Sequence, residues 1–283
     1  MTEHEIKITN IIKAICVPFI YNFIMIIVSA VFDIVLFFRQ VSDMNGYANF
    51  RASYTYMETL NNNMKKYSYM ITFISALIAI IVFGIVYVLQ IERENKGGFI
   101  EEIKYNNYKM LGFIVILGVF GSLGLSRFVS MLPLDNVIGN YKQTSENLLG
   151  GSFAVQIISI GIIVPIAEEI IYRGILYNRL KKLISPVYAM VLAAAMFGVF
   201  HFNLLQGTYA FLIGLLLTCV YIKCQSITAP ILMHSVANIT AIIAGSTGIS
   251  EFFSRNIFGY IVIMIIELII GCIFLELIIN DNE

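Results

Sequence analysis

Long apolar runs recur along the chain, and they constrain its fold more than any other feature. A helix rises about 1.5 Å per residue, so about 20 apolar residues cross the roughly 30 Å hydrocarbon core of a bilayer. The sequence offers eight such runs, near residues 11–38, 69–91, 110–132, 151–172, 187–203, 207–224, 227–246 and 257–279. These runs predict an all-α fold: a polytopic transmembrane bundle of about eight helices.

The composition agrees with a membrane protein and argues against several classes of function. Of the 283 residues, 59% are hydrophobic and 13% are charged, and the formal net charge is zero. Because the chain has no basic stripe and no glycine-rich phosphate motif, we expect neither nucleic acid nor nucleotide as a partner. The four cysteines lie in or beside apolar runs and form no C-x-x-C pair, which argues against a zinc–thiolate site.

The distribution of basic residues predicts the orientation of the helices. With the amino terminus in the cytoplasm, eleven Lys and Arg residues fall on the cytoplasmic side and six on the other side. An even number of spans then places both termini in the cytoplasm. We expect an outer loop over residues 39–68, whose tyrosines and asparagines leave open an interfacial helix or a solvated connector.

Two adjacent glutamates interrupt the run that begins at residue 151. The segment 157–176 reads IISIGIIVPIAEEIIYRGIL, and each carboxylate at membrane depth costs a few kcal/mol or more. Two neighbouring carboxylates resist ionising together, so they should titrate as a coupled unit, which suits a general base. Arg173 follows Glu169 by four residues, the spacing of an ion pair on one helical face. We expect this pair to leave Glu168 for chemistry; an ion network at the membrane interface is the alternative.

Two of the three histidines also lie in apolar runs, where each needs a polar partner. His201 ends the sequence FGVFH, one helical turn after Phe197. His234 begins the sequence HSVAN, one turn before Asn238. Either histidine alone could be a hydrogen-bonded packing residue, so their position relative to the glutamates decides their interpretation.

Counting residues places these groups at similar depths. Glu168 and His201 lie 17 and 15 residues from the Ser185–Pro186 turn, or roughly 20 to 25 Å at about 1.5 Å per residue. One carboxylate and two imidazoles in a water-accessible pocket suit hydrolysis. Glu168 would deprotonate water, and the histidines would bind a divalent metal or stabilise an oxyanion, with Asn238 as a further oxyanion donor.

The three motifs EExxxR, FxxxH and HxxxN, in this order, resemble those of the CAAX protease and bacteriocin-processing (CPBP) family of intramembrane endopeptidases. The resemblance covers residues 150–245, whereas the first 149 residues match only in being membrane helices. It suggests amino-terminal helices in 1–149, a catalytic core in 150–246 and a carboxy-terminal helix in 247–283. The residues that carry it are Glu168, Glu169, Arg173, Phe197, His201, His234 and Asn238.

The resemblance also implies roles for these residues. Glu168 and His201 would activate the attacking water, and His234 and Asn238 would support the tetrahedral intermediate, in a cavity open to the cytosol. Members are called metalloproteases, and a metal-free glutamate mechanism is the alternative. The chain has no HExxH zinc helix, but a zinc site with Glu168, His201 and His234 as ligands stays open.

The implied substrate is a peptide or protein associated with the lipid bilayer. Eukaryotic relatives cut prenylated CAAX tails, and bacterial relatives are linked to bacteriocin processing or self-immunity. The many Ile and Asn residues are typical of an AT-rich bacterium, so we expect a bacterial cell membrane and no prenylated substrate.

Two other classes of function are alternatives. A non-catalytic bacteriocin-immunity or scaffold protein would have no physical need for Glu168 together with both histidines. A small proton-coupled transporter could use Glu168 and Glu169 as proton sites, but the sequence lacks the inverted repeats that favour one.

Four further charged residues lie in or near apolar runs. Asp33 and Arg127 could form a pair, and Glu276 is close enough to the end of its run to reach water. We expect Glu267, deep in the last run, to be a neutral, hydrogen-bonded residue that faces the bundle.

Overall fold

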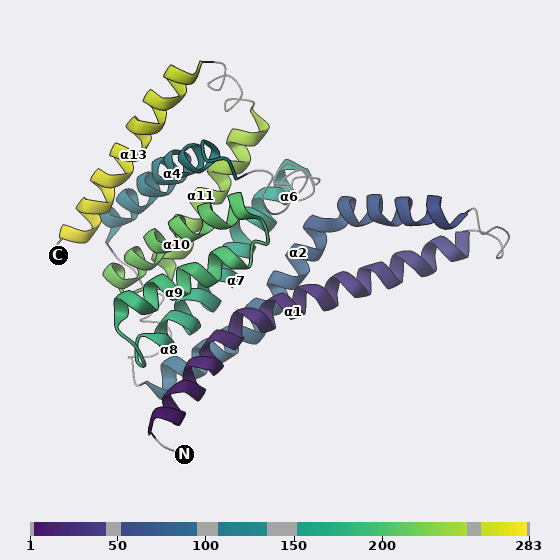
Figure 1. Ribbon diagram of the computed structural model, residues 1–283, viewed down its shortest axis with the longest axis horizontal. Coiled ribbons are helices and arrows are strands. Elements are labelled where there is room, and N and C mark those ends of the chain that lie inside the picture. The colour runs from purple at the N-terminus through teal and green to yellow at the C-terminus, as the bar shows by residue number, and fades with distance from the viewer. Residues whose placement is uncertain (1–2, 44–51, 95–106, 135–151, 248–255, 282–283) are drawn as a thin grey trace.

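The computed structural model describes residues 3–43, 52–94, 107–134, 152–247 and 256–281, and all of their regular structure is helical (Figure 1). Seven helices are long and apolar enough to cross a membrane, and an eighth is shorter, which confirms the predicted fold class. In chain order they are α1 (Glu3–Asp43), α2 (Ala52–Arg93), α4 (Tyr108–Ser130), one continuous helix made of α6 (Phe153–Gln156), η1 (Ile157–Ile163), α7 (Val164–Glu169), η2 (Ile170–Tyr177) and α8 (Asn178–Leu180), then α9 (Pro186–Val199), α10 (Leu204–Cys224), α11 (Thr228–Ser246) and α13 (Ile257–Asn280).

Asparagine side chains mark where several helices begin. The side chains of Asn107, Asn203 and Asn256 each accept a hydrogen bond from a backbone N–H two or three residues later. This is the usual N-cap arrangement, which satisfies a donor that the helix itself cannot pair. Pro186 begins α9, at a position where its missing N–H costs nothing. These local signals set the starts of α4, α9, α10 and α13 close to the predicted runs.

The predicted span at residues 187–203 is wrong in its extent. Helix α9 has 14 residues and ends at Val199, so its length of about 21 Å is too short to cross the hydrocarbon core. Phe202 then adopts a left-handed backbone with a φ of 52°, and Asn203 caps α10. His201 therefore lies in a turn between two helices, not inside a span. The N–H groups of His201 and Phe202 bond carbonyls three residues earlier, so the turn leaves neither donor unpaired.

Helix occupies most of residues 39–68, which were predicted as an outer loop with either an interfacial helix or a solvated connector. Helix α1 continues to Asp43, and α2 begins at Ala52, after which no proline or glycine interrupts it before Gly84. The side chains of residues 40–66 lie outside the described residues, so the interfacial position stays a prediction. Figure 1 shows α1 and α2 as a long pair whose connected ends reach past the other helices.

Glycines allow α4 to pack closely against α13 and α11. A Cβ atom added at Gly124 would lie 2.9 Å from a methyl carbon of Leu268, and one at Gly118 would lie 3.1 Å from the carbonyl oxygen of Met233. Small residues at such contacts let membrane helices approach closely. Helix α4 therefore lies between the last helix and α11, the helix that carries His234.

A buried ion pair joins α4 to α13. The Nε atom of Arg127 donates to Oε2 of Glu267 at 2.9 Å, and the two side chains are only 9% and 8% exposed. The Tyr260 ring lies over the guanidinium, with its centroid 5.3 Å from Cζ. Arg127 thus pairs with Glu267 and not with Asp33, because α4 packs along α13. Glu267 is hydrogen-bonded and faces the bundle as predicted, but its partner is a cation.

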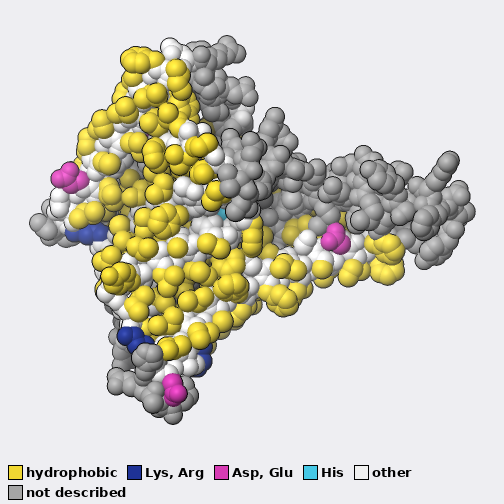
Figure 2. Space-filling view, in the orientation of Figure 1, with side chains coloured by type: hydrophobic (Ala, Val, Ile, Leu, Met, Phe, Trp, Pro, Cys, Tyr) yellow, Lys and Arg dark blue, Asp and Glu magenta, His cyan; other side chains and the backbone are white. Residues whose placement is uncertain are grey.

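One end of the bundle collects charged side chains. Lys109 lies 3.4 Å from the carboxylate of Asp281, Lys223 donates to the Asp281 carbonyl at 2.5 Å, and Lys182 pairs with Glu94. Helix α8 ends near this group, and α1 packs beside it, so both described ends of the chain lie on the same side. The face in Figure 2 is mostly apolar, with the visible charges near its margins, as expected of a surface in lipid.

The Arg127–Glu267 pair makes a testable contribution to stability. We expect Glu267→Gln to lower the free energy of unfolding by about 3 to 5 kcal/mol, because it leaves a buried guanidinium without its counter-charge. Thermal unfolding of the full chain in detergent would measure the change. Glu276→Gln, on the exposed side of the same helix, is the matched control and should change it by less than about 0.5 kcal/mol. Equal effects of the two substitutions would contradict a stabilising role for the Arg127–Glu267 pair.

Candidate active site

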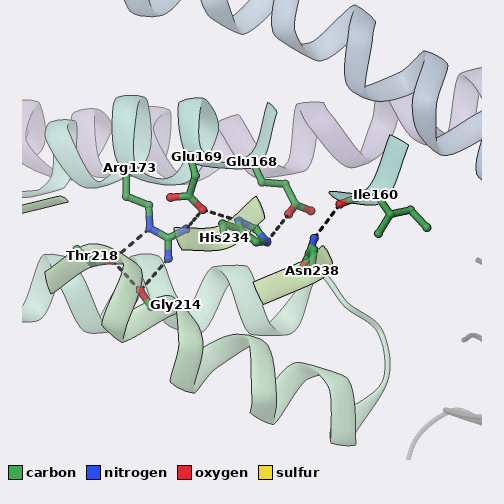
Figure 3. Close-up of polar contacts among 8 residues, drawn as sticks. All are labelled: Ile160, Glu168, Glu169, Arg173, Gly214, Thr218, His234 and Asn238. Atoms are coloured by element: carbon green, nitrogen blue, oxygen red, sulfur yellow. Dashed lines mark hydrogen bonds and ion pairs between the residues drawn. The ribbon is translucent and has the colours of Figure 1, made fainter. Parts of the chain in front are cut away.

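The side chain of Arg173 is fully buried and bonded on every side. Its Nη1 donates to Oε1 of Glu169 at 2.7 Å, which confirms the predicted ion pair. From α10, the Gly214 carbonyl accepts from Nη2 at 2.7 Å, and the Thr218 hydroxyl accepts from Nε at 3.3 Å (Figure 3). A charge out of water is costly unless it is paired and hydrogen-bonded. The guanidinium therefore fixes the glutamate-bearing helix against α10.

Glu169 also orients His234. Its Oε1 atom lies 2.8 Å from His234 Nδ1, and because an ionised carboxylate only accepts, Nδ1 carries the proton. The opposite ring nitrogen, Nε2, lies 3.6 Å from Oε2 of Glu168 (Figure 3). This separation is too long for a direct hydrogen bond, and a water that lies to one side of the pair can bond both atoms. The Glu168 side chain is 15% exposed and that of Glu169 is 0% exposed, so only Glu168 is open to such a ligand.

An irregular helix provides the partner of Asn238. In the π-helical segment η1 the N–H of Val164 bonds the carbonyl of Ser159, five residues earlier. The next N–H in this register would bond the Ile160 carbonyl, but Pro165 has no N–H. The Nδ2 atom of Asn238 donates to that carbonyl instead, at 2.9 Å. An amide nitrogen carries two hydrogens, so one of them stays available to a ligand.

The ring of Phe197 lies among the remaining motif side chains. Its centroid is 5.0 Å from that of His201 and 5.7 Å from that of His234, with the rings edge to face. The guanidinium carbon of Arg173 lies 5.2 Å from the same centroid. Phe197 therefore separates the two histidines and fills the space next to the buried charge.

His201 is held by a single backbone contact. Its Nδ1 atom lies 2.7 Å from the Phe197 carbonyl oxygen, which can only accept, so Nδ1 carries the proton. In the neutral ring, Nε2 is then an acceptor, as a group that takes a proton from water must be.

The structure brings together every motif side chain that the sequence singled out. Glu168, Glu169, Arg173 and His234 form one chain of contacts, Asn238 lies one turn further along α11, and Phe197 connects His201 to the group. Three partners of these side chains were not predicted from the sequence: Gly214, Thr218 and the Ile160 carbonyl. Gly214 and Thr218 lie four residues apart in an apolar run, and this spacing could have indicated a polar contact there. Pro165 could have indicated that the Ile160 carbonyl lacks its helical partner.

The segment that carries the three motifs matches a known protein family. Residues 150–240 match the family described as type II CAAX prenyl endopeptidase Rce1-like. The chain thus contains an Rce1-like segment. This family is one of membrane proteases, and the matched segment contains all three motifs, in agreement with their resemblance to the CPBP family. No curated protein and no solved structure matches the chain.

The Rce1-like segment does not present three metal ligands. Within the described part of the chain, no group of three or more His, Cys, Asp or Glu side chains could hold a metal ion. Glu168 and His234 approach each other, but His201 does not join them, and Nδ1 of each histidine already has a partner. The zinc site considered for these three residues therefore does not fit this arrangement.

The two adjacent glutamates of the Rce1-like segment should differ in their effect on stability. We expect Glu169→Gln to lower the free energy of unfolding by about 3 to 5 kcal/mol, because it removes the counter-charge of a buried guanidinium. Glu168→Gln should change it by less than about 1 kcal/mol, since Glu168 is partly exposed and makes no short hydrogen bond. Thermal unfolding in detergent compares two identical substitutions at neighbouring positions. A larger loss from Glu168→Gln would contradict the assignment of Glu169 as the structural member.

Proposed function

We propose that this protein is an integral membrane endopeptidase that hydrolyses peptide bonds of membrane-associated peptides or proteins, with Glu168 as the base that activates water. The observation that carries the proposal is the 3.6 Å gap between the Glu168 carboxylate and His234 Nε2. In a segment that matches a membrane protease family, such a gap between a carboxylate and an oriented imidazole suits one water molecule.

The proposed reaction begins with proton transfer from water to Glu168. The resulting hydroxide attacks the peptide carbonyl carbon, and the carbonyl oxygen becomes an oxyanion. Glu168 then returns the proton to the leaving nitrogen as the carbon–nitrogen bond breaks. His201 Nε2 is an acceptor in its neutral ring and assists in removing the proton from water.

Two donors are proposed for the oxyanion. One is the second amide hydrogen of Asn238, whose first is bonded to the Ile160 carbonyl. The other is Nε2 of His234 in the doubly protonated ring, whose Nδ1 is held by the carboxylate of Glu169. Glu169 thereby acts through His234, as a buried carboxylate orients the histidine of a hydrolytic triad.

The substrate class and topology belong to the same proposal. We place the catalytic core in residues 150–246, between the helices of 1–149 and 247–283, and both termini in the cytoplasm of a bacterial cell. The charged end formed by Lys109, Lys182 and Lys223 supports this orientation. CAAX-type tails and bacteriocin precursors are the two substrate types that a test should include.

Cleavage by the purified full chain in liposomes tests the proposal. The probes are a quenched-fluorescent farnesylated peptide ending in a CAAX sequence and a library of membrane-anchored peptides. We expect Glu168→Gln to lower kcat by a factor of about 10² to 10⁴, and His201→Ala to lower it as well. Glu276→Gln is the control and should retain wild-type cleavage. Binding of a probe without cleavage by the wild type would support the non-catalytic immunity or scaffold function instead.

Removal of metal provides a separate prediction. Because the described site lacks a third metal ligand, we expect cleavage to persist after dialysis against a zinc chelator. Cleavage that disappears with the chelator and returns with added zinc would contradict the glutamate mechanism. It would support the metalloprotease alternative while leaving the peptidase function in place.

A further inference from the structure

Helix α1 lies outside the Rce1-like segment, yet it packs against the helix that carries the glutamates. Ala14, Val17 and Tyr21 form its buried face, with exposures of 0%, 5% and 4%. This face belongs to the same buried cluster as Ala167 and Ile171, which flank the glutamate pair. Figure 3 shows α1 behind the glutamate helix, and its contacts with η2 and α8 show that the two are neighbours.

Helix α1 contacts the candidate active site at the turn that carries His201. The ring of Phe19 meets that of Phe200 edge to face, with centroids 4.9 Å apart, and Phe200 also contacts Phe202 at 6.1 Å. Phe202 has a φ of 52°, in the left-handed region that bulky residues seldom occupy. A strained turn persists only where surrounding structure holds it. Phe19 supplies such a contact directly beside His201.

We propose that α1 completes the active site, with Phe19 bracing the turn that carries His201. This inference rests on the proposed peptidase function and extends the site beyond residues 150–240. Phe19 is a positioning residue: it acts through His201, and the reaction does not consume it or form bonds to it.

Phe19→Ala, compared with Phe23→Ala, tests the brace. The two phenylalanines lie one turn apart on α1 and are 56% and 60% exposed, but among the described residues only Phe19 has a ring contact. We expect Phe19→Ala to lower kcat about tenfold or more, with KM changed less than about twofold, because small displacements of a catalytic group are costly. Phe23→Ala should match the wild type, and the conservative Phe19→Tyr should restore kcat.

The outcomes separate this inference from the proposed function. Cleavage of the farnesylated CAAX probe or of a library peptide by the wild type, lost in Glu168→Gln, establishes the peptidase. If Phe19→Ala and Phe23→Ala then have equal kcat, the bracing role is overturned and the function stands. An increase in KM alone would assign Phe19 to substrate binding and also overturn the positioning role. If the wild type cleaves no probe, both the function and this inference fail.

Discussion

The guanidinium of Arg173, held out of water at 0% exposure, is the constraint on which the rest of the site depends. Its partners come from three elements: the Glu169 carboxylate, the Gly214 carbonyl and Thr218 hydroxyl of α10, and the Phe197 ring of α9. A charge in that position requires all of them, because unpaired it would cost several kcal/mol. The requirement fixes Glu169, and Glu169 fixes the ring of His234. The positions of three helices thus follow from satisfying one cation.

The features that were predicted correctly from the sequence depend on residues close together in it. Apolar runs predicted eight spanning helices, of which seven are long enough to span, and the four-residue spacing predicted the Glu169–Arg173 pair, because both depend on residues close in sequence. The turn at Phe200–Asn203 escaped notice because it is rich in aromatic residues, and hydropathy does not register backbone direction. The partner of Arg127 was missed for another reason: pairing across helices depends on which helices are neighbours, and no local pattern encodes that.

The candidate active site depends on an irregular main chain as well as on its side chains. Two π-helical segments, η1 and η2, flank the turn of α-helix that bears the glutamates, and π-helical turns are frequent at functional sites. The missing N–H of Pro165 frees the carbonyl that anchors Asn238. The backbone therefore sets where the glutamates lie along their helix and the direction in which Asn238 donates.

The length of α1 has a practical consequence for imaging. Its 41 residues span about 61 Å, whereas even a helix tilted by about 40° needs only about 39 Å to cross a 30 Å core. About 20 Å of α1, summed over its two ends, therefore lies beyond the hydrocarbon core. A 31.8 kDa membrane protein ordinarily offers no feature by which single particles can be aligned. Here the α1–α2 pair provides one, and a rigid label fused near its tip would enlarge it without touching the site.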